Sequence, residues 1–232
     1  IAQDVADVVL LNNNFSLVPQ IIFEGDNVIA NLKFMNVLFL AKTFHAIIFA
    51  LICVVSGQIF PFLPASLLIY GFMVTSLPSY VIAFFRRTVN TSGKFWSEVL
   101  PDSILASLVG AGVSAYVYGA NLGADLKYVN TVIMYATLAF SLLFAIQQLW
   151  KGGYLSKWWH PVVVLVVIAV ISFAASLVPF LNIYYQVDNI GVTKWLGGWS
   201  VAIVGFIVYL LLQSLFKLFA DRILYRGYSN NN

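Results

Sequence analysis

The sequence predicts an all-α integral membrane protein: a bundle of six transmembrane helices with a short α/β segment at its N-terminus. Of the 232 residues, 61% are hydrophobic and only 9% are charged, whereas about a quarter of the residues of a soluble domain are charged. Uncharged apolar stretches of the roughly 20 residues that a spanning helix needs recur along the chain. All nine acidic residues lie outside these stretches. A chain of this composition is stable where a lipid bilayer supplies the apolar surroundings.

Turn residues and charges divide the apolar stretches into six predicted spans. The first stretch, 43–85, is long enough for two helices, and Ser56-Gly57-Gln58 with the prolines at 61 and 64 marks the turn between them. The spans are predicted at 35–57, 65–85, 101–120, 129–150, 161–180 and 196–217. Together they form a transmembrane domain at 34–227, which a short tail at 228–232 follows.

Basic residues are distributed unequally between the two sides of the predicted membrane. Lys127 and Lys194 lie on one side, and nine lie on the side that holds both chain ends. The positive-inside rule therefore places both ends in the cytoplasm, and an even number of spans requires them to share a side. The nine are Lys33, Arg86, Arg87, Lys94, Lys151, Lys157, Lys217, Arg222 and Arg226.

The first 33 residues are predicted to lie in the cytoplasm. The apolar run 6–11, which is followed by three asparagines, is typical of a buried strand and its turn. Ser16 is predicted to cap a short helix at 17–23 that Gly25 ends. A continuous helix over 26–57 would be about 46 Å long, which exceeds the roughly 30 Å of the hydrocarbon core. The surplus would form a stalk, although an ordinary juxtamembrane segment would have the same composition.

Lys42 is the first candidate functional residue, because its charge lies inside a predicted span. A charge in a membrane helix costs about 3 kcal/mol on insertion scales and marks a functional site by default. The alternative is a side chain that reaches back to the cytoplasmic interface. His45 lies three residues further on and would share the face of Lys42, and a hydrogen-bonded packing histidine is its plainer interpretation.

The second span contains a polar, proline-containing segment, Thr75-Ser76-Leu77-Pro78-Ser79. Pro78 removes a backbone donor and disrupts the turn before it. Carbonyl groups freed at membrane depth are tolerated where they line a cavity or where hydroxyls satisfy them, and broken helices supply carbonyl ligands to transported ions. The hydroxyls of Thr75 and Ser76 suit either an ion site or a simple proline kink.

Further polar candidates in the fourth span are Asn130, Gln147 and Gln148. The sequence contains no phosphate-binding Gly-rich loop, no nucleophile triad and no His/Cys cluster with metal-ligand spacing, and its one cysteine excludes an internal disulfide. We therefore predict no catalytic residue and no cofactor site in this chain. The small net charge of +3 gives no reason to expect a nucleic acid partner.

Three stretches resemble P-type cation-transporting ATPases. The run AQDVADVVLLNNNFSLVPQIIFEG at 2–25 resembles the end of their phosphorylation domain. The run EGDNVIANLKF, from Glu24, is similar to the start of their fifth transmembrane helix. The run TSLPSYVIAF is similar to their sixth helix, where the Leu77-Pro78 pair matches. The resemblance implies that 1–33 is the end of the phosphorylation domain with the stalk, and that the six spans are helices five to ten.

The resemblance implies the membrane part of an ATP-driven cation pump, in a bacterial plasma membrane. Its implied partners are the lipid bilayer, the transported cation and a missing N-terminal part with the actuator domain, the nucleotide-binding domain and the first four helices. ATP and Mg²⁺ are implied for the parent protein and neither for this chain. The motifs DKTGT, TGES and GDGxND are not in this sequence, so we expect that the chain alone does not hydrolyse ATP.

The chain departs from calcium pumps at their ion ligands. The positions of two ligands of their fifth helix and two of their sixth are here Thr43, Ala46, Gly71 and Thr75, so the acidic ligands of these helices are missing. Lys42 falls where the gastric proton/potassium pump carries a lysine that acts as an internal counter-charge. The predicted ion-path candidates are Lys42, Thr43, His45, Gly71, Thr75, Ser76 and Pro78.

Two alternatives stay open at this point. The chain would also suit a stand-alone six-helix membrane channel or accessory subunit without ATPase activity. It would suit, in addition, a degenerate remnant that serves only as a membrane scaffold, although the retained Lys42 and Leu77-Pro78 argue against that interpretation.

Overall fold

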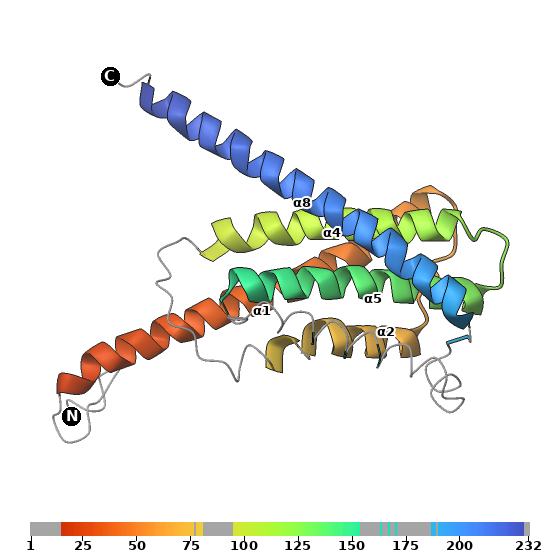
Figure 1. Ribbon diagram of the computed structural model, residues 1–232, viewed down its shortest axis with the longest axis horizontal. Helices are drawn as coiled ribbons and strands as arrows, with labels where there is room; N and C mark the ends of the chain where they lie inside the picture. Colours follow the sequence, from red (N-terminus) through yellow and green to blue (C-terminus); the bar gives the residue numbers. More distant parts are fainter. Residues whose placement is uncertain are drawn as a thin grey trace.

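The computed structural model describes residues 15–76, 78–80, 95–153, 163, 167, 170, 187, 188 and 190–229. The elements formed in these ranges are all helical (Figure 1), and no strand occurs among them. The all-α prediction is therefore confirmed for this part of the chain. The elements are the 3₁₀ turn η2 (Phe15–Leu17), α1 (Val18–Val55), α2 (Pro64–Gly71), the π-helical turn η3 (Phe72–Ser76), α4 (Phe95–Gly119), α5 (Leu126–Lys151) and α8 (Gly191–Ser229).

Four of the described helices are long and apolar enough to cross a membrane: α1 with η2, α4, α5 and the part of α8 up to Leu218. They correspond to the first, third, fourth and sixth predicted spans. The second predicted span begins as α2 and η3, and its end at 81–85 lies outside the described residues. The fifth span, 161–180, lies outside them apart from three helical positions. The count of six spans stays a prediction.

The N-terminal helix differs from the prediction. A helix at 17–23 that ends at Gly25 is wrong, because α1 runs without a break from Val18 to Val55. A glycine inside a helix costs only about 1 kcal/mol relative to alanine, which the long apolar helix tolerates. The N-cap residue is Leu17 rather than Ser16, and it makes no side-chain cap hydrogen bond. The predicted strand at 6–11 lies outside the described residues.

The helices α1 and α4 run in one direction and α5 and α8 in the other, so that α1 begins and α8 ends at the same end of the bundle (Figure 1). Two ion pairs lie at this end: Lys33 contacts Glu98 at 2.9 Å, and Lys151 contacts Asp102 at 2.8 Å. At the opposite end of the bundle, Lys127 contacts Asp188 at 2.9 Å. The described lysines are therefore sorted between the two ends in the way that the sequence predicts.

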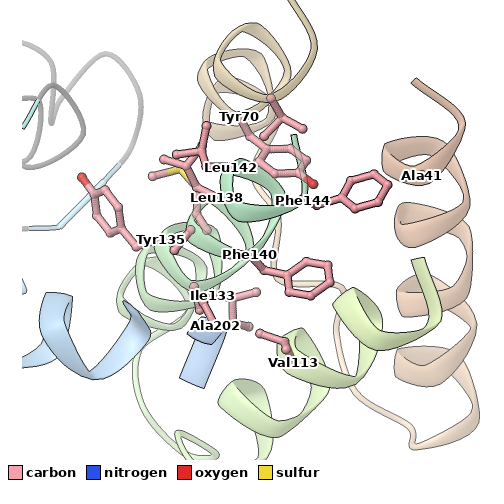
Figure 2. Packing of buried hydrophobic residues seen from close by; sticks show 14 of the residues in the cluster. Ala41, Tyr70, Val113, Ile133, Tyr135, Leu138, Phe140, Leu142, Phe144 and Ala202 are labelled. Atoms are coloured by element: carbon pink, nitrogen blue, oxygen red, sulfur yellow. The ribbon is translucent and has the colours of Figure 1, made fainter. Parts of the chain in front are cut away.

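The helix α5 is the centre of the bundle. In the most apolar 18-residue stretch of α5, 94% of the residues are buried, whereas the corresponding share for α8 is 22%. A helix that is apolar all round is buried in protein or faces lipid. The helix α5 is buried in protein, whereas α8 exposes its apolar side chains. Figure 2 shows side chains of α5, such as Phe140 and Ile133, packed among Tyr70 of α2, Val113 of α4 and Ala202 of α8.

The crossing of α4 and α8 depends on a glycine. A Cβ atom added at Gly205 would collide with the Val113 side chain, so that only a glycine lets the two helices approach this closely. The described helices thus enclose α5.

Candidate functional site

Lys42 extends from the middle of α1 to the junction between α2 and η3. Its amine nitrogen lies 6.0 Å from the centroid of the Tyr70 ring, within the range of a cation–π contact. A Cβ atom added at Gly71 would lie only 2.5 Å from the same nitrogen. The amine therefore occupies space that exists because residue 71 has no side chain. The structure thus brings two of the predicted candidates, Lys42 and Gly71, together.

A cavity of about 20 Å³ lies beside this contact. A buried water needs at least roughly 10–15 Å³ of such space, so the cavity has room for one water molecule. Its polar border comes from Lys42 and His45 of α1, Tyr70 of α2 and Ser141 of α5. The hydroxyl oxygens of Tyr70 and Ser141 are 3.1 Å apart. The remaining lining residues are Leu38, Ala41, Val74, Ala106, Gly110, Phe140 and Phe144.

His45 is buried, with 4% of its surface exposed. Its Nε2 atom lies 2.9 Å from the Ser114 hydroxyl of α4, and that hydroxyl lies 2.9 Å from the Thr137 hydroxyl of α5. The ring stacks on Phe49 and meets Phe62 edge-on. A chain of hydrogen bonds therefore joins α1 to α4 and α5 in the interior of the bundle.

The second span is irregular between Phe72 and Ser76, where η3 replaces the α-helix. The buried Pro78 explains the position of this turn, since its missing N–H would have bonded to the carbonyl of Val74, inside η3. Thr75 belongs to the same turn, and its buried Oγ1 atom has no hydrogen-bond partner in the described part of the chain. Single π-helical turns occur frequently at functional sites.

Two of the predicted candidates lie apart from the cavity or at its edge. Thr43 is exposed, and its hydroxyl donates to the carbonyl of Phe39 in its own helix at 2.9 Å. Ser76 is half-buried at the end of η3. The structure therefore gathers Lys42, His45 and Gly71 around the cavity, places Thr75 in the adjoining turn, and leaves Thr43 on the outer face of α1.

Asn130, a further polar candidate, joins α5 to the start of α2. It is fully buried in α5, and its side-chain oxygen accepts from the backbone N–H of Leu63 at 3.1 Å and from the Ser66 hydroxyl at 2.9 Å. These bonds hold the first turn of α2 against α5. Asn130 thus positions the element that carries Tyr70 and Gly71.

Gln147 and Gln148 lie in a polar cluster around Asp102, at the end of the bundle where α8 leaves it. The Asp102 carboxylate accepts from Gln148 at 3.3 Å, from Lys151 at 2.8 Å and from Gln213 of α8 at 2.7 Å. Gln147 donates to the side-chain oxygen of Gln213 at 3.0 Å. These two candidates therefore contact a carboxylate that joins α4, α5 and α8, and they do not border the cavity.

Sequence reasoning missed Tyr70, Ser114, Thr137 and Ser141 as parts of the site. Serine, threonine and tyrosine are common in membrane helices, and the bond from His45 to Ser114 joins residues 69 positions apart. Hydroxyl residues in the other apolar spans were possible hydrogen-bond partners for His45. No spacing in the sequence distinguished Ser114 and Thr137 from the other serines and threonines.

No family model matches the chain. The chain is 27% identical over 179 residues to a probable cation-transporting ATPase, exp7, of Streptococcus pneumoniae, and the match covers 66% of this chain and 23% of that protein. It is 28% identical over 123 residues to the calcium-transporting ATPase CtpE of Mycobacterium bovis, covering 49% of this chain and 15% of that protein. CtpE of Mycolicibacterium smegmatis is 26% identical over the same length.

The matched region is therefore less than a quarter of the length of these curated relatives. Four described helices of the chain are long and apolar enough to cross a membrane, and no catalytic motif of an ATPase is in the sequence. The curated homologues of this chain are cation-transporting P-type ATPases, which confirms the resemblance that the sequence predicted.

Proposed function

We propose that this chain is the C-terminal membrane part of an ATP-driven cation pump and that the cation passes close to Lys42, where α1 meets η3. The placement of the Lys42 amine against Gly71 carries this proposal, because it puts a charge from the middle of a described span beside a broken helix. Broken helices at membrane depth are where transporters bind their ions. The relatives support a cation as the transported species, since each is named a cation-transporting or calcium-transporting ATPase.

The Lys42 charge would control when a cation is held and when it is released. Two unit positive charges 4 Å apart repel by about 4 kcal/mol at the effective dielectric constant of a protein surface, and by more in a drier site. A displacement of the amine by a few ångströms would therefore change the affinity for a nearby cation by about an order of magnitude. Because α1 is continuous from Val18 to Val55, a movement of its first turns would reach Lys42.

The remaining parts of the proposal concern the parent protein. An N-terminal part would supply the first four helices and the domains that bind ATP and Mg²⁺, and it would drive α1. Both chain ends would lie in the cytoplasm of a bacterial cell, which the sorting of the described lysines between the two ends of the bundle supports. The relatives do not favour a stand-alone channel or accessory subunit.

Replacement of Lys42 by alanine in the full-length pump tests the proposal. We expect Lys42→Ala to change the cation concentration that gives half-maximal ATPase activity, because removal of the charge removes its repulsion of the bound ion. ATPase activity is measured against a panel of cations that includes Ca²⁺. Lys217→Ala removes the same charge from an exposed position of α8 and is the control. An identical cation dependence in the wild type and Lys42→Ala would contradict the role of Lys42.

A further inference from the structure

The hydrogen bonds around Ser114 favour a hydrogen on Nε2 of His45. A hydroxyl has one hydrogen to donate. When Thr137 donates its hydrogen to the carbonyl of Ile133 at 2.8 Å, its oxygen accepts from Ser114. The other acceptor within reach of Ser114, the carbonyl of Gly110 at 3.1 Å, would take the same single hydrogen. In both cases the Ser114 oxygen accepts from His45, and Nε2 of His45 carries the hydrogen.

The second ring nitrogen of neutral His45, Nδ1, is then an acceptor. It is buried and has no hydrogen-bond partner among the described residues. A buried acceptor without a donor costs free energy. Lys42, one turn earlier on the same face of α1, has the opposite character, because an ammonium group has three donors and no acceptor. The contact that the structure describes for this ammonium is with the ring of Tyr70.

The cavity matches these two groups in size and in polarity. Lys42 and His45 both border it, together with Tyr70 and Ser141, and its volume of about 20 Å³ suits one water molecule. A water molecule both accepts and donates hydrogen bonds, and a buried water typically makes about three of them. The border of the cavity supplies a donor, an acceptor and two hydroxyl groups.

We propose that the cavity is a binding site for one water molecule, which accepts a hydrogen bond from the Lys42 ammonium and donates one to Nδ1 of His45. His45 is thereby a positioning residue: through this water and its bond to Ser114, it holds the ammonium beside Gly71. The consequence for transport rests on the proposed function, since it is the position of this charge that would set the affinity for the cation.

Nuclear magnetic resonance of the histidine ring tests the proposal without measuring transport. The full-length protein is labelled with ¹⁵N-histidine in lipid nanodiscs, and the His45 signals are assigned by their loss in His45→Gln. We expect a hydrogen on Nε2 and, for Nδ1, the resonance of an unprotonated nitrogen that accepts a hydrogen bond. Lys42→Met keeps the length of the side chain but removes the donor that orients the water, so the Nδ1 resonance is expected to move towards that of a free nitrogen.

Two further variants make the result specific. Gly71→Ala keeps the ammonium but displaces it, because the new Cβ would lie 2.5 Å from the nitrogen, and it should move the Nδ1 resonance as well. Lys217→Met removes an exposed lysine and should leave the resonance unchanged. A hydrogen on Nδ1 in the wild type would overturn the proposal, as would an Nδ1 resonance that neither Lys42→Met nor Gly71→Ala moves.

The two proposals can fail separately. If Lys42→Ala leaves the cation dependence of the ATPase unchanged while the His45 resonances respond as expected, the water site stands and the role of Lys42 in transport does not. If the resonances do not respond but the cation dependence changes, Lys42 acts on the ion without the help of His45.

Discussion

Individual residues of the site differ in how far the sequence revealed them. Lys42 stood out because a charge inside an apolar run is costly. Gly71 was found through the resemblance to ion pumps, whereas Thr75 was already a candidate because it belongs to the polar segment beside Pro78. Thr43 follows Lys42 in the sequence but lies on another face: successive helix residues are about 100° apart around the axis, and Thr43 is exposed on the outer face of α1. The sequence does not show which face of a wholly apolar helix is turned inwards, because both faces are hydrophobic.

Ser114 offers a test at the scale of the residue. We expect Ser114→Ala to destabilise the protein by about 1 kcal/mol, because it breaks the chain from His45 to Thr137, and interhelical hydrogen bonds in membranes average roughly 0.6 kcal/mol with a maximum near 1.7. Thermal unfolding in detergent, followed by tryptophan fluorescence, measures the change. Ser200→Ala is the matched control, since the Ser200 hydroxyl is exposed and donates only to its own helix. Equal losses in both variants would show that the chain contributes nothing.

Among the elements, α1 and the second span show where local patterns mislead and where they inform. A single glycine did not end α1, because the residues on both sides continue the helix. The proline of the second span did predict a broken helix, but the irregular turn lies before Pro78, at Phe72–Ser76. The break precedes the proline because the missing donor is that of the proline while the freed acceptor lies four residues earlier. Sequence alone does not show that a π-helical turn forms where Pro78 removes a backbone hydrogen bond.

Pro78→Ala tests η3 as an element. The substitution restores a backbone donor, and a proline inside a helix costs about 3 kcal/mol, so we expect a higher unfolding temperature. The same change would let α-helix replace η3 and move Thr75, so the cation concentration for half-maximal ATPase activity is expected to rise. Pro101→Ala, in the first turns of α4, is the control and should leave the cation dependence as it is. A Pro78→Ala protein that is more stable but binds cations normally would separate η3 from the ion site.

At the scale of the whole molecule, apolar runs and charge sorting carried the prediction. They indicated stretches that overlap the four described helices long and apolar enough to cross a membrane, and they separated Lys33 and Lys151 at one end of the bundle from Lys127 at the other. They did not reveal that α5 lies in the centre, because α5 and α8 are similarly apolar and only their neighbours differ. The apolar runs and the charges also did not reveal the Asp102 cluster, because a carboxylate at the edge of a span is typical of an ordinary span boundary.

Asp102 tests how the bundle is closed at this end. Replacement by alanine leaves Lys151, Gln148 and Gln213 without their common acceptor, and we expect a loss of about 1–3 kcal/mol in unfolding free energy. The control is Asp188→Ala at the other end, whose ion pair with Lys127 is more exposed and is worth roughly 0–1 kcal/mol. Thermal unfolding of the two variants in the same detergent gives the comparison. A larger loss in Asp188→Ala than in Asp102→Ala would contradict the structural role of the cluster.

The small size of the cavity beside Lys42 has a consequence for the path of an ion. A cation in water carries several water molecules, whereas this cavity has room for one. A hydrated cation therefore does not fit between α1 and α2 as they are packed here. Any ion that passes Lys42 must lose its hydration shell before it arrives, or the two helices must first separate.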